Sequence, residues 1–153
     1  MRRATVTWMY ARIGIRLAWR EGVAASGAPS ASAVTIQVRF AGSGPVNATS
    51  DALAFALPFA DGVTAMTVMY HRIQMVAGKA SREQSILAHV LAHEIGHILQ
   101  CTNQHSQTGV MKAHWNGQDY DAMGKKPLDF TQDDVDLILQ GLNSMKTRTP
   151  NTK

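Results

Sequence analysis

The chain has 153 residues, of which 45% are hydrophobic, and this size and composition fit one globular domain and exclude a disordered chain. Its net charge of +4 is small, and it contains neither a block of like charges nor a nucleic-acid-binding motif, so we expect no nucleic-acid partner. No stretch contains the ~20 apolar residues that a membrane span requires, so we expect no membrane partner.

The N-terminal region contains basic residues but neither an uninterrupted apolar core nor a small-residue cleavage site. The chain as given therefore carries no secretory signal. This leaves the compartment open: secreted or periplasmic if a signal was removed, and otherwise cytoplasmic. The single cysteine, Cys101, excludes a disulfide within the chain. We expect one domain over residues 1–145, a basic flexible tail over residues 146–153, and a monomer.

The first half of the chain predicts one helix and three extended segments. Residues 5–14 (TVTWMYARIG) are expected to form a short helix. Residues 15–20 (IRLAWR) alternate apolar with polar or small side chains, which is typical of a half-buried strand. Residues 33–40 (AVTIQVRF) predict a second strand with its apolar side chains on one face. A loop that includes LAFALPF (53–59) follows, and residues 63–73 (VTAMTVMYHRI) form a third extended run.

Helical periodicity in the middle of the chain predicts a helix from about Arg82 to Gln100. The stretch from Ser81 to Gln84 matches a capping box, in which the serine hydroxyl caps a backbone N–H and the glutamine reaches back. The apolar residues that recur at helical spacing are Ile86, Leu87, Val90, Leu91, Ile98 and Leu99. We expect this apolar face to pack under the sheet.

Near the C-terminus, Thr131 followed by three polar residues is typical of a capped helix start. The next apolar residues, Val135, Ile138, Leu139 and Leu142, lie on one face and indicate a packing helix. Residues 143–153 are expected to form a loose tail. The predicted fold is therefore α+β, with a small twisted sheet packed on the central helix and a further helix at the C-terminus.

The central helix contains His-Glu-x-x-His at His93, Glu94 and His97. Positions i and i+4 share one helix face, so both imidazoles can bind one metal ion. Glu94 lies about 100° round the helix from His93, where a base can take a proton from a zinc-bound water. The motif predicts a zinc hydrolase with two histidine ligands and a glutamate base.

Two histidines cannot hold a catalytic zinc ion alone, so a third ligand must follow the helix. Cys101 is one turn further along the same helix, where three ligands in line make poor tetrahedral corners, so we expect a small buried thiol there. Asn103 is a weak zinc ligand. His105, eight residues after the motif, suits a loop that returns to the metal and is the preferred ligand. Asp119 and Asp121 are alternatives, as is Cys101.

Three other histidines are less suited to the metal. His89 could pair with His93, but no glutamate would then take the base position, so we expect a core histidine or one that supports a ligand. His71 is expected to be an ordinary polar strand residue. His114 is expected to pack beside the site or support it.

These residues resemble those of the metzincins, zinc endopeptidases defined by His-Glu-x-x-His-x-x-Gly-x-x-His and a later methionine turn. In this chain HEIGH is followed by His105 and Ser106 and then by GVM, which ends at Met111. The stretch NQHSQTGVMKAHW is similar to the corresponding sequences of the matrixin branch and of small bacterial metzincin-like proteins. The resemblance implies a metzincin-like catalytic domain, with His105 as the third ligand and Met111 as a hydrophobic floor beneath the zinc. It also implies that the third extended run borders the cleft and pairs with an extended substrate.

The resemblance is close over residues 86–115 and partial over residues 4–75. Gln100 stands at the usual glycine position and Asn103 at the usual third histidine, so the loop is two residues longer here. Metzincin domains usually begin with a strand, whereas this chain begins at the first helix. Other zinc classes fit less well, because no glutamate follows Glu94, as a gluzincin requires, and the aspartates of GQDYDAMG are out of step with the aspzincin motif.

We therefore expect a zinc-dependent endopeptidase that hydrolyses peptide bonds with a zinc-activated water. Zinc held by His93, His97 and His105 would lower the pKa of that water to about 7, and Glu94 would take its proton. Two alternatives are a zinc-stabilised binding or regulatory domain with little or no protease activity, and an intracellular regulatory protease specific for one partner. The intact glutamate argues against the first alternative. A purely structural zinc ion has no use for a general base, and its site normally closes the fourth ligand position.

Overall fold

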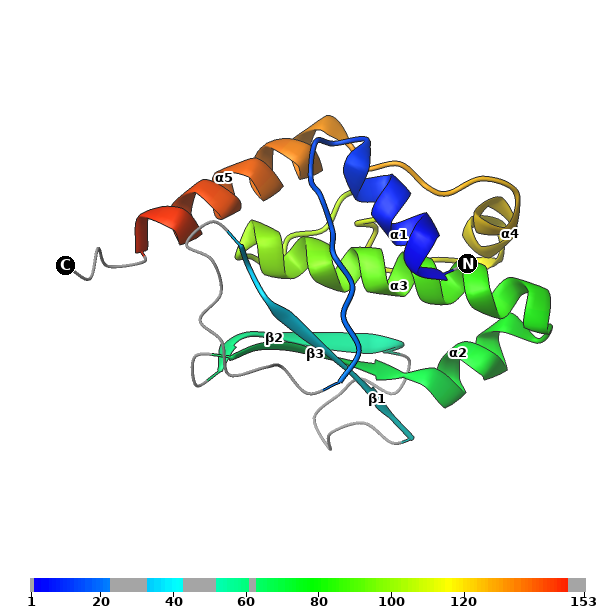
Figure 1. The fold of residues 1–153 in the computed structure, drawn as a ribbon. Coiled ribbons are helices and arrows are strands. Elements are labelled where there is room, and N and C mark those ends of the chain that lie inside the picture. The colour runs from blue at the N-terminus through cyan, green and yellow to red at the C-terminus, as the bar shows by residue number, and fades with distance from the viewer. Residues whose placement is uncertain (1, 23–32, 43–51, 61–62, 149–153) are drawn as a thin grey trace.

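The computed structural model has an α+β fold with one small mixed sheet (Figure 1). It describes residues 2–22, 33–42, 52–60 and 63–148. The elements in chain order are α1 (Arg2–Ala11), β1 (Ile36–Ala41), β2 (Ala54–Ala60), β3 (Val63–Met69), α2 (Tyr70–Ala77), α3 (Ala80–Gln100), α4 (Gly117–Lys125) and α5 (Gln132–Arg148). The predicted class agrees with this architecture. Within the described part of the chain, no helix has the length and apolar character of a membrane span.

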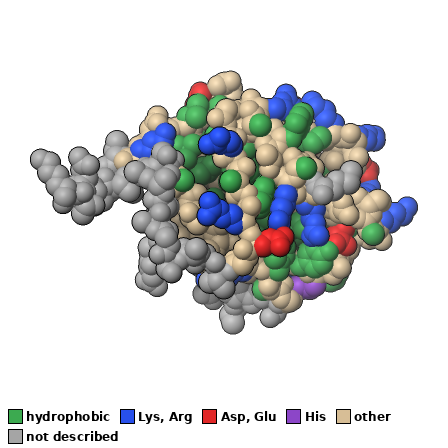
Figure 2. Space-filling view, viewed as in Figure 1, with side chains coloured by type: hydrophobic (Ala, Val, Ile, Leu, Met, Phe, Trp, Pro, Cys, Tyr) green, Lys and Arg blue, Asp and Glu red, His purple; other side chains and the backbone are tan. Residues whose placement is uncertain are grey.

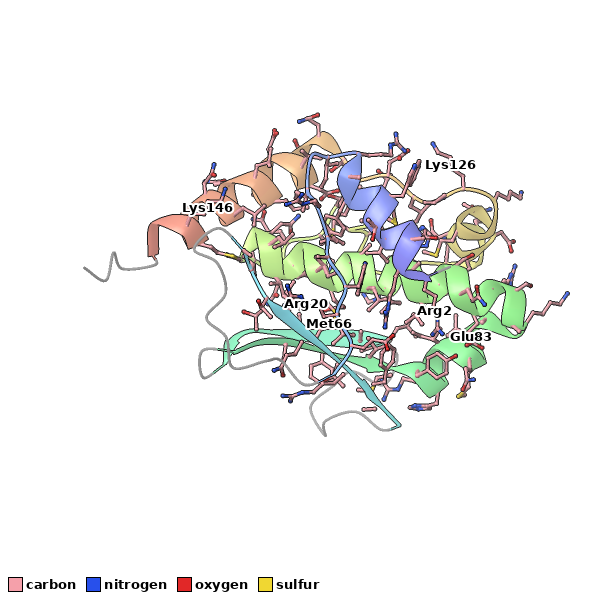
Figure 3. The ribbon with its side chains drawn as sticks, viewed as in Figure 1. Arg2, Arg20, Met66, Glu83, Lys126 and Lys146 are labelled. Carbon is pink, nitrogen blue, oxygen red and sulfur yellow. The ribbon has the colours of Figure 1, made fainter. Side chains whose placement is uncertain are left out.

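The sheet has the strand order β1-β3-β2, so β3 is its central strand. β1 runs parallel to β3, with Ile36 opposite Thr64, and β2 runs antiparallel to it, with Ala54 opposite Val68. Met66 on β3 is 1% exposed and lies between the sheet and α3 (Figure 3). Side chains alternate between the two faces of a strand, so Met66 and Val68 anchor the same face in the core.

Helix α3 forms the centre of the fold. The sheet packs on one side of it, and α1 and α5 pack on the other (Figure 1). Every residue from Ile86 to Gln100 is buried, as in other helices that are enclosed on all sides. The predicted packing of one apolar face under the sheet is therefore incomplete, because α1 and α5 also cover the opposite face.

The N-terminal region forms the predicted helix and a half-buried extended segment, but that segment does not pair with the sheet. Helix α1 begins and ends three residues earlier than expected. The segment 15–20 alternates half-buried apolar residues with exposed ones, and the Trp19 indole N–H donates to the Thr7 hydroxyl over 2.9 Å. It is not paired with any strand of the described sheet. The expected half-buried strand is thus an extended segment that packs on the core with its side chains alone.

The region between β1 and α3 departs most from the prediction. The LAFALPF stretch, expected as a loop, forms most of β2. Its Pro58 is compatible with a strand because β2 lies at the sheet edge, where a missing N–H breaks no ladder. The third extended run ends as a strand at Met69, and Tyr70 begins α2, so His71 lies on a helix and not on a strand.

The two predicted helix starts have different outcomes. The prediction of a capping box at Ser81 is wrong. Helix α3 begins at Ala80 with Lys79 as its N-cap, so the serine already lies within the first turn, and no side chain caps the helix. The cap at Thr131 is confirmed. The Asp134 backbone N–H donates to the threonine hydroxyl over 3.2 Å, and the Thr131 N–H donates to the Asp134 carboxylate over 2.8 Å.

The C-terminal region is more helical than expected. Helix α5 continues to Arg148, into the segment predicted as a loose tail, and residues 149–153 lie outside the described residues. Helix α4 was not predicted. It begins with a capping box between Asn116 and Asp119, a signal that the sequence contains and that we assigned to a possible ligand motif instead.

Charged side chains lie on the surface without forming one block. Lysine and arginine side chains are spread between apolar and polar groups over the face in Figure 2. Two N-terminal arginines form ion pairs, Arg3 with Glu21 at 3.1 Å and Arg12 with Asp129 at 2.6 Å. Exposed pairs of this kind contribute at most about 1 kcal/mol each, so the fold depends on its core and not on these charges.

Candidate metal centre

Three histidines converge at one point beside α3. His93 and His97 lie one turn apart on the helix, and His105 comes from the loop that follows it. The chain reverses at Cys101, which ends the helix in the left-handed conformation with φ 56°, and this turn lets the loop return. The Nε2 atom of His97 lies 2.9 Å from that of His93 and 3.1 Å from that of His105.

Backbone carbonyls fix the ring tautomers of the two helix histidines. The Nδ1 of His93 lies 2.8 Å from the Val110 carbonyl oxygen, and the Nδ1 of His97 lies 3.1 Å from that of Thr102. Because a carbonyl only accepts, each Nδ1 donates its proton, and each Nε2 keeps a lone pair. Two lone pairs that face each other cannot share a hydrogen bond, so this arrangement calls for a cation between them.

The separations suit a metal ion. Tetrahedral nitrogen ligands at about 2.0–2.1 Å from a zinc ion lie about 3.3 Å apart. The three candidate ligand atoms all lie within 4.8 Å of one another, and these residues could hold a metal ion. A backbone carbonyl on the second ring nitrogen is also the usual support of a metal-binding histidine.

The electrostatics keep the histidines neutral, which is the form that binds metal. Burial, together with the neighbouring imidazoles, lowers the pKa of His93 to about 3 and that of His97 to about 4. Burial and the nearby His114 lower the pKa of His105, whose side chain is more exposed. At neutral pH all three rings are therefore available as ligands.

Glu94 lies beside this cluster and is 9% exposed. Burial raises its pKa to about 7, and a hydrogen bond from the Ala56 backbone N–H acts in the opposite direction. Ala56 belongs to β2, so the carboxyl group lies between the helix that carries the histidines and the edge of the sheet.

The outer edge of β2, which pairs with no strand of the described sheet, faces Glu94. The Met69 N–H donates to the Leu53 carbonyl over 2.8 Å, so Leu53 directs its backbone groups toward β3. In an antiparallel pair this direction alternates, which leaves the backbone groups of Ala54 and Ala56 on the open edge. The strand expected to border the cleft and pair with a substrate, β3, is instead paired on both sides, so that prediction is wrong, and the edge strand that contacts Glu94 is β2.

Met111 packs against Gly96, a neighbour of the helix histidines in sequence. Met111 is fully buried, and a Cβ atom on Gly96 would lie 2.5 Å from its sulfur. Gly96 is on α3 between the two helix histidines in sequence, so its missing side chain lets the methionine pack closely against the helix. The Trp115 ring stands edge-on to His93, with centroids 5.3 Å apart.

A buried carboxylate anchors the loop that carries His105. Asp134 is 2% exposed and accepts a hydrogen bond from the hydroxyl of Ser106, the next residue after His105. The Ser106 N–H donates to the Met111 carbonyl over 2.9 Å. Asp134 also caps α5 through Thr131, so one side chain joins the α5 start to the histidine loop. We assigned Asp134 only to the helix cap, because nothing local to the sequence links it to Ser106.

The alternative ligands lie elsewhere in the described structure. Cys101 is exposed, not buried as expected, because it occupies the turn that ends α3. Asp119 caps α4 and forms an ion pair with Lys112 at 2.7 Å. Asp121 pairs with Arg82. None of these acidic or thiol groups belongs to the histidine cluster found among the described residues.

Two further histidines, His89 and His114, lie outside the cluster. His89 is fully buried; its Nδ1–H donates to the Ser85 carbonyl over 2.7 Å, and its Nε2 accepts from the Leu128 N–H over 2.9 Å. It is therefore the expected core histidine. His114 is exposed, near enough to His105 to affect its pKa.

No protein-family model matches the chain, and no curated protein or solved structure shows significant similarity to it. The resemblance to the metzincins therefore depends on the residues of this site, and the function has to be argued from their geometry.

Proposed function

We propose that this protein is a zinc-dependent endopeptidase with a metzincin-like catalytic domain. One observation carries the proposal: three imidazole Nε2 atoms converge beside a buried glutamate, at a strand edge that is unpaired in the described sheet. The histidines, the glutamate and the strand edge each have a use in peptide hydrolysis. A site with a purely structural metal would need only the histidines.

Zinc is the metal that this donor set favours. Three neutral imidazoles, two of them with carbonyl support at the second nitrogen, are typical ligands of catalytic zinc, whereas calcium and magnesium prefer oxygen ligands. His93, His97 and His105 would hold the ion. When bound, zinc would supply Lewis acidity, lowering the pKa of a water to about 7 and polarising the scissile carbonyl.

Glu94 would act as the general base and then as the general acid. Its carboxylate takes a proton from the attacking water and passes that proton to the amine of the leaving peptide. Burial favours this role, since a carboxyl group away from bulk water exchanges protons near neutral pH. The residue follows His93 directly, so the helix itself places the base beside the ligands.

The substrate class follows from the edge of β2. The Ala54 backbone groups and the Ala56 carbonyl that face away from β3 can pair with an extended peptide by strand addition. Such a peptide would lie along the strand whose Ala56 N–H already contacts the Glu94 carboxylate. Recognition through main-chain hydrogen bonds favours an unfolded or extended protein segment over a small ester or amide.

The test is a comparison of Glu94→Gln with the wild-type chain, both reconstituted with zinc. Peptide hydrolysis is measured on a library of extended peptides, and zinc content is measured on the same samples. We expect the variant to keep about one zinc per chain and to lose at least a thousandfold in hydrolysis. Glu83→Gln, at the other end of α3, is the matched control and should hydrolyse like the wild type.

Two results would contradict the proposal. Hydrolysis retained by Glu94→Gln would remove the glutamate from the mechanism. A zinc-loaded wild type that cleaves no peptide in the library, and none of the proteins of its own cell extract, would instead indicate a zinc-stabilised binding or regulatory domain.

A further inference from the structure

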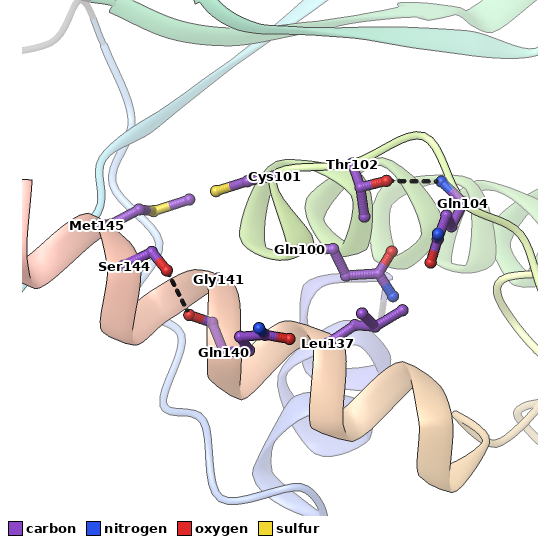
Figure 4. A pocket seen from close by; sticks show the side chains of 9 residues that line it. All are labelled: Gln100, Cys101, Thr102, Gln104, Leu137, Gln140, Gly141, Ser144 and Met145. Carbon is purple, nitrogen blue, oxygen red and sulfur yellow. Dashed lines mark hydrogen bonds between the residues drawn. The ribbon is translucent and has the colours of Figure 1, made fainter.

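A cavity of about 280 Å³ lies between the C-terminal end of α3 and the C-terminal half of α5 (Figure 4). Gln100, Cys101 and Thr102 form one wall, and residues of α5 between 137 and 145 form the other. None of the three clustered histidines lines it, so it is a separate site from the metal centre.

The side-chain amide of Gln100 is the unusual feature of this cavity. Gln100 is 5% exposed, and neither its Oε1 nor its Nε2 has a hydrogen-bond partner among the described residues. Buried polar groups in folded proteins are almost always paired, by protein, water or ligand. An unpaired buried amide in the wall of a cavity therefore points to an occupant that supplies both a donor and an acceptor.

The other lining residues restrict the chemistry of that occupant. Among the described residues that line the cavity none is charged: Thr102, Gln104, Gln140 and Ser144 offer hydrogen bonds, and Leu137 and Met145 offer apolar surface. A charged ligand would lose its hydration there without gaining a counter-charge. The volume is near the lower end of the range for ligand pockets, about 300–1,000 Å³, so the occupant is small.

We infer that this cavity binds a small uncharged molecule that carries a primary carboxamide. Such a group presents an N–H and a C=O on the same edge, so it can donate to the Gln100 Oε1 and accept from the Gln100 Nε2 in one pair of hydrogen bonds. A trans peptide unit has its N–H and C=O on opposite sides and cannot make this pair. The cavity thus distinguishes a carboxamide from a peptide backbone.

The position of the cavity places its ligand on the loop that serves the metal centre. Thr102 lines the cavity, while its carbonyl oxygen accepts the hydrogen bond from the His97 Nδ1. Gln104 also lines the cavity and directly precedes His105. A carboxamide bound here would therefore contact the loop that carries His105.

Titration of the ¹⁵N-labelled full chain with acetamide tests the inference by NMR. We expect saturable shifts of the Gln100 side-chain NH₂ and of the Thr102 and Ser144 backbone amides. N-Methylacetamide and acetate should bind at least tenfold more weakly, the first because it is a trans amide and the second because it is charged and lacks an N–H.

Three variants complete the test. Gln100→Leu should weaken acetamide at least tenfold, and Gln118→Leu, on the exposed surface of α4, should not. Ser144→Phe fills the cavity from an exposed position and should abolish binding even if the first variant is unstable. Linear, non-saturating shifts, as from a cavity that holds only water, would overturn the inference. Equal binding of acetate, or undiminished binding in Gln100→Leu or Ser144→Phe, would also overturn it.

Discussion

Gly96, which lies between the two helix histidines in sequence, is in direct contact with Met111, and a Cβ atom on the glycine would lie 2.5 Å from the methionine sulfur. The contact joins the helix that carries His93 and His97 to the turn that follows His105. The helix and the histidine loop are therefore joined by a packing contact between two residues outside the histidine cluster.

Gly96→Ala should destabilise the protein by about 1–3 kcal/mol, the usual cost of overpacking a filled core, although alanine is the better helix former. Urea unfolding monitored by circular dichroism measures the difference. Gly124→Ala is the matched control, because a Cβ atom at Gly124 meets nothing within 4 Å. The two variants should change the free energy of unfolding unequally, and equal effects would mean that Met111 does not pack against the helix as described.

Asp134→Ala should lower both stability and zinc affinity. The carboxylate is buried and accepts from the Ser106 hydroxyl and the Thr131 N–H, so its loss should cost about 2–3 kcal/mol. The loop that carries His105 would lose its anchor, and we expect zinc affinity to fall about 10–100-fold, as for other groups that orient metal ligands. Competition with a chromogenic chelator measures this affinity.

Asp133→Ala is the control for that measurement, since the neighbouring carboxylate is exposed. It should change zinc affinity less than twofold. If Asp134→Ala lowered stability but left zinc affinity at the wild-type value, the carboxylate would serve the α5 cap alone.

His89 should make the metal-free protein sensitive to acid. Burial lowers the pKa of His89 in the folded state, so it stays neutral while the unfolded chain binds a proton below about pH 6.5. The unfolded state thus gains protons as pH falls, and the free energy of unfolding should decrease by up to about 1.4 kcal/mol per pH unit from this residue.

Urea unfolding at several pH values from 7.5 to 5 measures the slope for wild type and His89→Gln, both without metal. The variant should be less stable at pH 7 but should lose stability less steeply below about pH 6.5. Gln118→Ala, at an exposed position that does not titrate, should keep the wild-type slope. Parallel slopes for wild type and His89→Gln would show that His89 does not stay neutral in the folded protein.

Much of the site could be anticipated from local spacing. The i, i+4 rule places His93 and His97 on one helix face, and a short loop is enough to bring His105 back to them. The Thr131 cap is also local, since its partners are within one helical turn. Features set by residues close in sequence were therefore predictable.

Features that depend on distant contacts were not. β2 contains a proline and alternates weakly, and it is a strand because β3 pairs with it. The link from Asp134 to Ser106 spans 28 residues, and the need for glycine at Gly96 arises only when Met111 packs beneath it. Ser81 does not cap α3, because the helix begins at Ala80. A short sequence motif does not locate the start of a helix to within one residue.

The most direct test of the central claim is the zinc content of wild type, His105→Ala and His114→Ala, measured by elemental mass spectrometry after zinc loading and buffer exchange. The three-histidine centre predicts about one zinc per chain in wild type and in His114→Ala, and a loss of most zinc in His105→Ala. Zinc retained at the wild-type level by His105→Ala, or absent from all three proteins, would contradict a zinc centre formed by His93, His97 and His105.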